Sequence, residues 1–358
     1  MATRAPNVED VARLAGVSRQ TVSNVLNAPH KVRPDTAQRV QQAIAELGYR
    51  PHASARRLRT RRSATVGVHL NPYRGGISGV LLDRFVHALT ESASKRSVRV
   101  LVHAARSPEE ELHQIADLTD SGEIDGVVLS GTDHEDERIA WLNARKIPFA
   151  SFGRSWNGDG ERGNFRWVDV DGAAGTRLAT EHALNNSGQN IAFLGWPSPS
   201  GTGDDRERGW AEALRAAGIG GASQNPGPRA VSADSVAQSR MAAQEMLDSH
   251  PQIDAIICAS DSLAIGAHMA AVSTGRPDLL IIGFDNTPAA EALGLSSVEQ
   301  RPELVADAVL KQLFGATGNT VVENPGDASS ESVLITPKLI IRTPITAQAP
   351  IDPDSHEA

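Results

Sequence analysis

The stretch VSRQTVSNVLN, residues 17–27, decides how the first part of the chain is organised. Val22, Val25 and Leu26 fall at positions i, i+3 and i+4, which form one apolar face of a short helix. The opposite face carries hydrogen-bonding side chains, with Arg19 as the one charge among Arg19, Gln20, Thr21, Ser23, Asn24 and Asn27. Such a face is suited to contact with a polar surface as well as with solvent.

The residues on either side of this stretch predict two more helices. NVEDVARLAG begins with Asn7 as a plausible N-cap and ends at Gly16, and Ser18 is positioned to cap the next helix. RPDTAQRVQQAIAELG has Pro34 in its first turn and Gly48 beyond its last. A helix, a tight turn, a second helix and a supporting helix form the helix-turn-helix layout, in which the second helix enters the DNA major groove.

The charge distribution supports a DNA-binding head. Residues 1–62 contain twelve Lys/Arg and four Asp/Glu, a net charge of +8, whereas the whole chain carries −8. Residues 63–358 therefore carry −16. A small basic segment on a large acidic one indicates that the first meets a polyanion while the second stays clear of it.

Length and composition limit the remaining possibilities. A chain of 358 residues predicts two or three domains. No apolar run approaches 18 residues and no hydrophobic segment opens the chain, so we expect neither a membrane span nor a secretory signal. The single cysteine, Cys258, lies in the apolar run DAIICAS, which favours a packing role and a reducing cytoplasm.

From Ser63 onward the chain alternates strands with helices. The strand-like runs are TVGVHL, VRVLVHAA, IDGVVLSG, IPFASFG, WVDVDG, NIAFLGW, DAIICAS and LLIIGFD. Amphipathic helical stretches such as SGVLLDRFVHALTESASKR separate most of them. Buried runs that alternate with helices predict an α/β body with parallel sheets covered on both faces. About nine strands are too many for one small domain, so we expect two lobes.

The head resembles a known family. VEDVARLAGVSRQTVSNVLN, AELGYRP and SARRLRT match, without gaps over residues 7–60, the N-terminus of the LacI/GalR family of bacterial transcription regulators. The resemblance implies that DNA is contacted by Ser18, Arg19, Gln20, Thr21, Ser23, Asn24, Asn27 and Tyr49. The chemistry fits, because Arg can pair with guanine, Gln with adenine, and hydroxyls with phosphates. Asn24 departs from the family, in which Arg is common at this position.

The stretch RPHASARRLRTRRSA is similar to the hinge of the same family. The resemblance implies that Arg56 and Arg57 bind phosphates and that Leu58 wedges into the minor groove from a short helix that forms on DNA. The alternative is a flexible basic linker. Both interpretations are compatible if the segment is flexible in the free protein and becomes helical on DNA.

The resemblance extends to the body, for which it implies a periplasmic-binding-protein-like architecture whose chain crosses between lobes three times. We expect the helix-turn-helix domain over 1–50, the hinge over 51–62 and the effector-binding and dimerisation domain over 63–344. The first lobe is expected over 63–160 and 287–331, and the second over 161–286 and 332–344. The polar, Pro-rich tail, 345–358, is expected to be disordered.

Ligands of doubly wound sheets bind outside the carboxyl ends of the strands. Residues after the predicted strands give the effector-site candidates Tyr73, Arg154, Trp156, Trp196, Arg206, Ser260 and Asp285. Aromatic faces with charged hydrogen-bonding groups suit a sugar, and the resemblance implies that Arg206 and Asp285 clamp its polar edge. Trp156 and Trp196 are either ring-stacking or packing residues. Asp261 is either an N-cap or a hinge residue, and Trp210 is expected in the core.

The motifs favour a regulator over an enzyme or a transport protein. The sequence has no Gly-x-Ser-x-Gly elbow, no Walker loop and no His-Glu-x-x-His motif, and no metal or cofactor site is expected. A sugar-transport protein would share the body but not the basic head. The resemblance implies a nucleoid-associated homodimer on double-stranded operator DNA, released by a small sugar. The alternative is a corepressor-type regulator that binds a purine or another non-sugar metabolite.

Overall fold

The protein is described from a computed structural model, in which the contacts divide the chain into two compact units, residues 1–63 (the head) and 64–358 (the body). The described residues are 6–49, 62–70, 79–134, 136–154, 156, 165–221, 226–315, 318 and 332–342. Apart from Arg62, the expected hinge over 51–62 lies outside them, as does the expected tail over 345–358.

The head contains the predicted helices α1 (Val8–Ala15), α2 (Arg19–Asn27) and α3 (Pro34–Leu47), with a short 3-10 turn η1 (Pro29–Lys31) between the last two. Asn7 caps α1 in a reciprocal capping box with Asp10, and Ser18 Oγ accepts the amide of Thr21 at 3.1 Å to cap α2. Each such cap stabilises a helix by about 1 kcal/mol. Gly16 and Gly48 end their helices in the left-handed conformation, with φ of 66° and 60°. The predicted layout of the head is therefore confirmed.

The apolar faces of the three helices form one small core. Val11, Val22 and Val40 are completely buried in it. Leu26, which the sequence places on the apolar face of α2, remains 37 % exposed, so the buried stripe of this helix is narrower than its periodicity predicts. The polar face of α2 is thus held at the surface of the head by a core on the opposite side.

The body contains two six-stranded sheets. The first sheet has the order β11-β5-β4-β3-β1-β2 and is entirely parallel. Its strands are β1 (Thr65–Leu70), β2 (Arg99–Ala104), β3 (Gly126–Ser130), β4 (Phe149–Phe152), β5 (Arg166–Val170) and β11 (Val333–Ile335).

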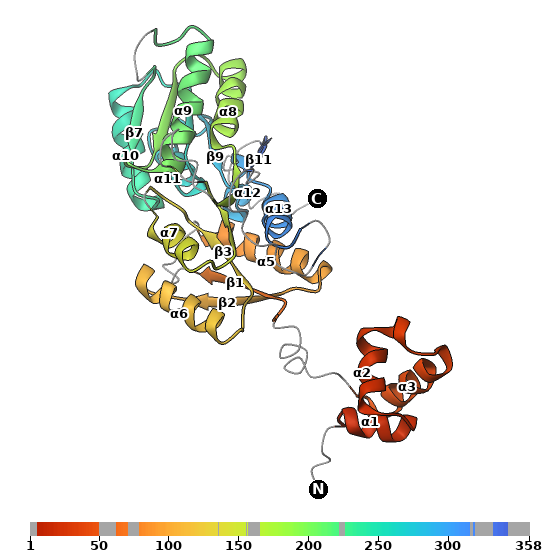
Figure 1. Ribbon diagram of the computed structural model, residues 1–358. Helices are drawn as coiled ribbons and strands as arrows, with labels where there is room; N and C mark the ends of the chain where they lie inside the picture. The colour runs from red at the N-terminus through yellow and green to blue at the C-terminus, as the bar shows by residue number, and fades with distance from the viewer. Residues whose placement is uncertain are drawn as a thin grey trace, which may run out of the picture. The chain divides into compact units, whose positions relative to one another are not determined.

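Helices cover both faces of the first sheet (Figure 1). They are α5 (Gly79–Lys95) and α13 (Pro302–Phe314) on one face and α6 (Pro108–Asp120) and α7 (Glu137–Ala144) on the other. Successive residues of β3 point to opposite faces: Val128 packs with α5 and α13, and Val127 packs with α6 and α7. Burial on both faces explains why these strands are continuous apolar runs in the sequence.

The second sheet has the order β12-β10-β9-β8-β6-β7, and only β12 runs antiparallel to its neighbour within the described pairings. Its strands are β6 (Ile191–Gly195), β7 (Arg229–Val231), β8 (Ala255–Cys258), β9 (Leu280–Phe284), β10 (Ser296–Glu299) and β12 (Lys338–Ile340). Its helices are α8 (Gly172–Asn186), α9 (Gly201–Ala216), α10 (Val236–Ser249), α11 (Asp261–Ser273) and α12 (Pro288–Ala292).

The core of the second lobe contains two residues that the sequence assigns to packing. Trp210 is completely buried, and its Nε1 donates to the carbonyl of Ile191 at 3.2 Å. Cys258 is also completely buried, and this burial raises the pKa of its thiol well above the ordinary value. Both assignments are therefore correct, and the thiol is chemically inert under ordinary conditions.

The lobe boundaries expected from the sequence need correction. β5 and β11 belong to the first sheet, and β10 belongs to the second, opposite to the expected assignments. The chain crosses after β5, after β10 and again between β11 and β12, so each crossing lies later than the expected 160–161, 286–287 and 331–332. The physical reason is that β5, β10 and β11, the last strands before the three crossings, each pair with the sheet of the lobe from which the chain departs.

Candidate functional site

The exposed face of α2 carries the first candidate site. Arg19 is 68 % exposed, and its Nη1 lies 3.1 Å from Glu9 Oε1 of α1. Gln20 is exposed, and its Nε2 donates to Asn24 Oδ1 at 3.0 Å. The two side chains that best match base recognition therefore lie at the head surface, and each has a partner on the head itself.

The other predicted DNA-contacting residues have mixed positions. Thr21, Ser23 and Asn24 lie half-buried on α2, and Asn27 is its last residue. Tyr49 is 9 % exposed and packs in the head core, so its ring is not part of the α2 surface. Arg56, Arg57 and Leu58 lie outside the described residues.

The second candidate site is a cavity of about 340 Å³ in the body. It is lined from the first lobe by Leu81, Gly131, Thr132 and Asp133, and from the second by Trp196, Ser200, Gly201, Thr202, Arg206, Asp234 and Asp285, with Gln300 at the second crossing. The cavity lies where strands of both sheets end, as expected for doubly wound folds. Its volume is at the small end of the ~300–1,000 Å³ typical of small-molecule sites.

Arg206 and Asp285 form the charged centre of this cavity. Arg206 Nη1 lies 3.8 Å from Asp285 Oδ1, and the guanidinium lies 3.7 Å from the centroid of the Phe284 ring and 5.3 Å from that of Trp196. Burial raises the pKa of Asp285 to about 7, opposed by the nearby charge of Arg206. Burial also lowers the pKa of Arg206, although four carboxylates act in the opposite direction.

Two buried donors in the cavity wall have no acceptor within the described part of the chain. They are Nε of Arg206 and Nε1 of Trp196. A buried N–H without a partner costs ~1–3 kcal/mol. The same wall combines the indole of Trp196 with the charged groups of Arg206 and Asp285, a combination suited to a polyhydroxylated molecule.

The turn that carries Asp285 has an unusual backbone. Asp285 and Asn286 have φ of 107° and 51°, a region that side-chain-bearing residues rarely adopt. Arg84 of α5 stabilises this turn from the first lobe, because its Nη1 donates to the carbonyls of both residues at 3.2 and 3.3 Å. Its Nη2 also donates to both carboxylate oxygens of Glu299 at 3.0 and 3.1 Å. The position of Asp285 is therefore fixed by both lobes.

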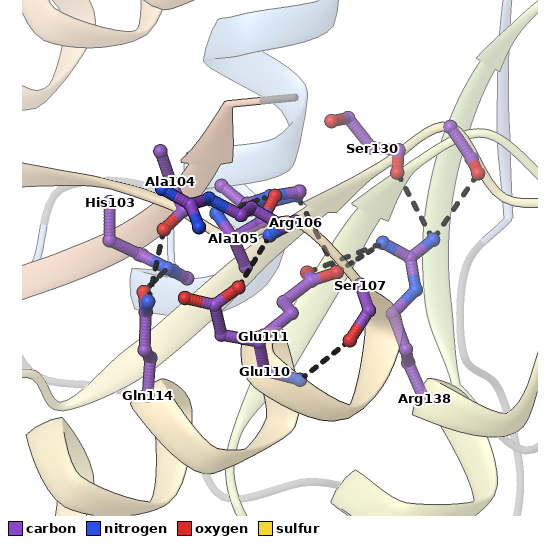
Figure 2. Close-up of polar contacts among 12 residues, drawn as sticks. His103, Ala104, Ala105, Arg106, Ser107, Glu110, Glu111, Gln114, Ser130 and Arg138 are labelled. Carbon is purple, nitrogen blue, oxygen red and sulfur yellow. Dashed lines mark hydrogen bonds and ion pairs between the residues drawn. The ribbon is translucent and has the colours of Figure 1, made fainter. Parts of the chain in front are cut away.

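The first-lobe rim of the cavity, Gly131–Asp133, is supported from behind by a buried charge cluster (Figure 2). Arg138 Nη2 donates to the carbonyls of Ser130 and Gly131 at 3.1 and 3.2 Å. Arg138 Nη1 donates to Glu111, whose other neighbour is His69 at 3.5 Å. With its remaining bonds to Asp136, the guanidinium is fully occupied and acts as a rigid support rather than a ligand contact.

Two predicted effector residues bridge the lobes instead of lining the cavity. Arg154 follows β4, and its Nε and Nη2 bind Asp169 at 2.6 Å and Asp205 of α9 at 3.3 Å. Trp156 stacks on Arg154, with 4.7 Å from the guanidinium to the ring centroid, and lies against Gly201 so closely that a Cβ there would overlap the ring. The packing interpretation of Trp156 is favoured over ring stacking on a ligand.

Some of the remaining predicted effector residues line the cavity, and one binds a residue that lines it. Trp196, Arg206 and Asp285 line the cavity, whereas Tyr73 lies outside the described residues. Ser260 does not line it but donates to Asp234, which does, at 2.6 Å.

Asp261 is not an N-cap, because Ser260 caps α11. Its carboxylate instead accepts from the amide of Thr287 and the hydroxyl of Ser297, each at 2.6 Å. These bonds tie the start of α11 to β10 and to the residue before α12.

Several cavity residues were missed by the sequence argument. Thr132 and Asp133 directly follow β3, a strand that was predicted, so the same strand-end rule could have found them. Asp234 and Gln300 follow β7 and β10, strands too short or too polar to be recognised. The described residues contain no group of three or more His, Cys, Asp or Glu side chains arranged to hold a metal ion. None of the described helices is long and apolar enough to cross a membrane.

Comparison with known proteins agrees with both units. Residues 7–52 match "Bacterial regulatory proteins, lacI family", and residues 81–343 match "Periplasmic binding proteins and sugar binding domain of LacI family". The chain belongs to the LacI family. A member of this family is a transcription regulator with a helix-turn-helix head and a periplasmic-binding-protein-like body, and it is not an enzyme.

Individual LacI-family relatives cover most of the chain. The HTH-type transcriptional regulator CelR of Thermobifida fusca is 31 % identical, over 88 % of this chain and 94 % of CelR. The ribose operon repressor of Halalkalibacterium halodurans is 31 % identical, over 82 % and 85 %. A structure described as a CelR–cellobiose complex is 26 % identical, covers 95 % and 99 % of the two chains, and has a TM-score of 0.64.

Proposed function

We propose that this LacI-family regulator is a homodimeric cytoplasmic repressor of carbohydrate uptake or catabolism genes, released from its operator by an uncharged sugar. The observation that carries the proposal is the cavity wall, in which the indole of Trp196 lies beside the charged groups of Arg206 and Asp285. Sugar hydroxyls can bind charged groups of this kind, and the ring faces of a sugar suit the indole of Trp196. The cellobiose bound by a relative supports the same ligand class.

The charge of the cavity favours a neutral ligand over a phosphorylated one. Among the described residues that line the cavity, Asp133, Asp234 and Asp285 are acidic and Arg206 is the single cationic one. An added phosphate would face an excess of carboxylates and would have one guanidinium, already beside Asp285, to bind it. Like charges in a partly desolvated site repel strongly, so the described part of the wall favours a neutral sugar over a sugar phosphate.

The test begins with an operator selected from random DNA by the full-length protein. Neutral mono- and disaccharides, the matching sugar phosphates and purines are then titrated into the protein–operator complex. We expect a neutral sugar to weaken operator binding about 5- to 150-fold, the usual range of allosteric coupling. The Asp285→Ala variant should still bind the operator but should not be released.

Other outcomes would assign a different function. Tighter operator binding with a purine would identify a corepressor-type regulator. Release by a sugar phosphate but not by the free sugar would contradict the charge argument. Normal release of the Asp285→Ala variant would show that Asp285 is structural and that the effector binds elsewhere.

A further inference from the structure

We propose that two side chains of the head position the base-reading residues without reading a base themselves: Asn24 positions Gln20, and Glu9 positions Arg19. The inference rests on the proposed function, because it assumes that α2 binds operator DNA. The additional claim is that contacts between side chains of the head contribute to its preference for particular bases. Both contacts are direct, at 3.0 Å for Gln20 Nε2 to Asn24 Oδ1 and 3.1 Å for Arg19 Nη1 to Glu9 Oε1.

The Asn24–Gln20 contact leaves the right atoms free. The two residues are four apart on α2, so their side chains lie on one face of the helix. The Gln20 amide has one carbonyl and two N–H groups, and the bond to Asn24 occupies one N–H. The other N–H and the carbonyl remain for N7 and N6 of adenine, the pair that a glutamine needs for this base. Asn24 therefore fixes the plane of the amide without blocking its recognition edge.

The Glu9–Arg19 contact differs from the Asn24–Gln20 contact because Glu9 carries a negative charge. Glu9 lies in the first turn of α1 and is 53 % exposed, so it places a negative charge beside the helix that meets a polyanion. Such a charge weakens binding to every DNA sequence by repelling phosphates. In compensation for this loss of affinity, Glu9 fixes the orientation of the Arg19 guanidinium by binding one side of it. The guanidinium has five N–H donors, so an edge with two donors remains for guanine O6 and N7.

The experiment measures base preference at each operator position by selection from randomised half-sites with the full-length protein. Gln20→Ala and Arg19→Ala first identify the base pair that each side chain reads. Asn24→Ala should then reduce preference at the Gln20 base pair about 2- to 13-fold, the range for losing the preorganisation of one side chain. It should leave the Arg19 base pair unchanged and have no further effect in the Gln20→Ala background.

A conservative variant separates positioning from packing. Asn24→Asp keeps an oxygen acceptor for Gln20 Nε2, so it should retain base preference while binding all sequences more weakly through phosphate repulsion. Gln41→Ala, on an exposed position of α3, is the matched control and should change neither quantity. Thermal melts of each variant check that the head remains folded.

Glu9→Ala should have opposite effects on affinity and on specificity. Removing the carboxylate should strengthen binding to unrelated DNA, and losing the contact to Arg19 should weaken base preference at the Arg19 position. If Asn24→Ala instead weakened binding to all sequences equally and left base preference unchanged, Asn24 would be a phosphate ligand and the proposal would be overturned. If the wild-type protein selected no preferred sequence, the proposed function itself would fail, and this inference with it.

Discussion

Asp285 is the lining residue of the cavity whose ionisation is most affected by its surroundings. Its carboxylate is buried near Arg206, accepts from Gln300 Nε2 at 2.5 Å and is also influenced by Asp261 and Asp234. Burial raises its pKa from 3.8 to about 7, so near neutral pH the folded protein holds this group partly protonated. Hydroxyl groups can donate to the charged form and accept from the protonated form, so Asp285 would suit the sugar proposed above in either state.

The raised pKa of Asp285 predicts a pH-dependent stability. The folded protein binds this proton more tightly than the unfolded chain, so stability falls as pH rises through the folded pKa of about 7. Between pH 6 and pH 8 the contribution lost is about 1.4 kcal/mol. Asp285→Asn keeps an oxygen for Gln300 and removes the titration, so the stability of the wild type relative to this variant should fall by that amount.

The measurement uses urea unfolding of the full-length protein followed by tryptophan fluorescence, because all five tryptophans lie in the body. A difference between wild type and Asp285→Asn that stays constant from pH 6 to pH 8 would show that this carboxylate is already ionised throughout the range.

For single residues, the sequence predicts which side chains lie at strand ends better than it predicts whether those side chains line the cavity. Residues at the ends of recognisable strands, such as Trp196 and Asp285, line the cavity. Arg154 and Trp156 satisfy the same rule yet face a partner on the other lobe, Asp205 in one case and Gly201 in the other. No local pattern reveals this, because which strand-end side chains meet across a cleft depends on the approach of the two lobes.

At the scale of elements, a glycine determines how closely α8 and α9 pack. A Cβ at Gly209 of α9 would overlap the carbonyl oxygen of Ala173 and the hydroxyl of Thr176 on α8. We therefore expect Gly209→Ala to destabilise the body by about 1–3 kcal/mol through overpacking. Gly79, the first residue of α5, serves as the control, because no described residue lies within 4 Å of its Cβ position. Alanine there should be neutral or slightly stabilising.

Equilibrium unfolding of both glycine variants checks this prediction. Because Arg206 lies on α9 as well, Gly209→Ala should also weaken effector binding, whereas Gly79→Ala should not. Equal stability of Gly209→Ala and the wild type would mean that α8 and α9 separate without cost, in contradiction to the buried contact between them.

Elements of the fold follow from the sequence wherever they are long or capped. The three head helices and the eight strand-like runs were predicted because caps, glycine stops and apolar runs mark them. β7, β11 and β12 were missed because they are three residues long, and β10 was missed because the buried Ser296 and Ser297 make it polar. Such strands are stabilised by the sheet that receives them rather than by their own residues.

At the scale of the whole body, Arg154 links the lobes through Asp205, and its side chain is 16 % exposed. Because this bond requires the lobes to be as close as they are here, Arg154→Met should favour a more open arrangement. Inducer affinity should fall about fivefold or more, within the range of allosteric coupling. Amide hydrogen exchange should become faster at the start of α9, while operator affinity without inducer should remain within about twofold.

Arg145→Met is a matched control for that change. Arg145 also pairs with a carboxylate, Asp120 at 3.6 Å, and stacks on a tryptophan, Trp141 at 4.9 Å, but both partners belong to the first lobe. It should leave inducer affinity unchanged. Unaltered hydrogen exchange at the start of α9 in Arg154→Met would contradict a bridging role for Arg154.

The two closing strands of the body have a consequence for the order in which the protein is made. β11 and β12 complete one edge of each sheet, and α13 covers one face of the first. A ribosome must therefore synthesise almost the entire chain before either lobe can close, whereas the head, packed only from residues before 50, can fold as soon as it emerges. A nascent chain that stalls near residue 330 would carry a finished DNA-binding unit on a body whose sheet edges at β5 and β10 are still unpaired, and such edges invite aggregation.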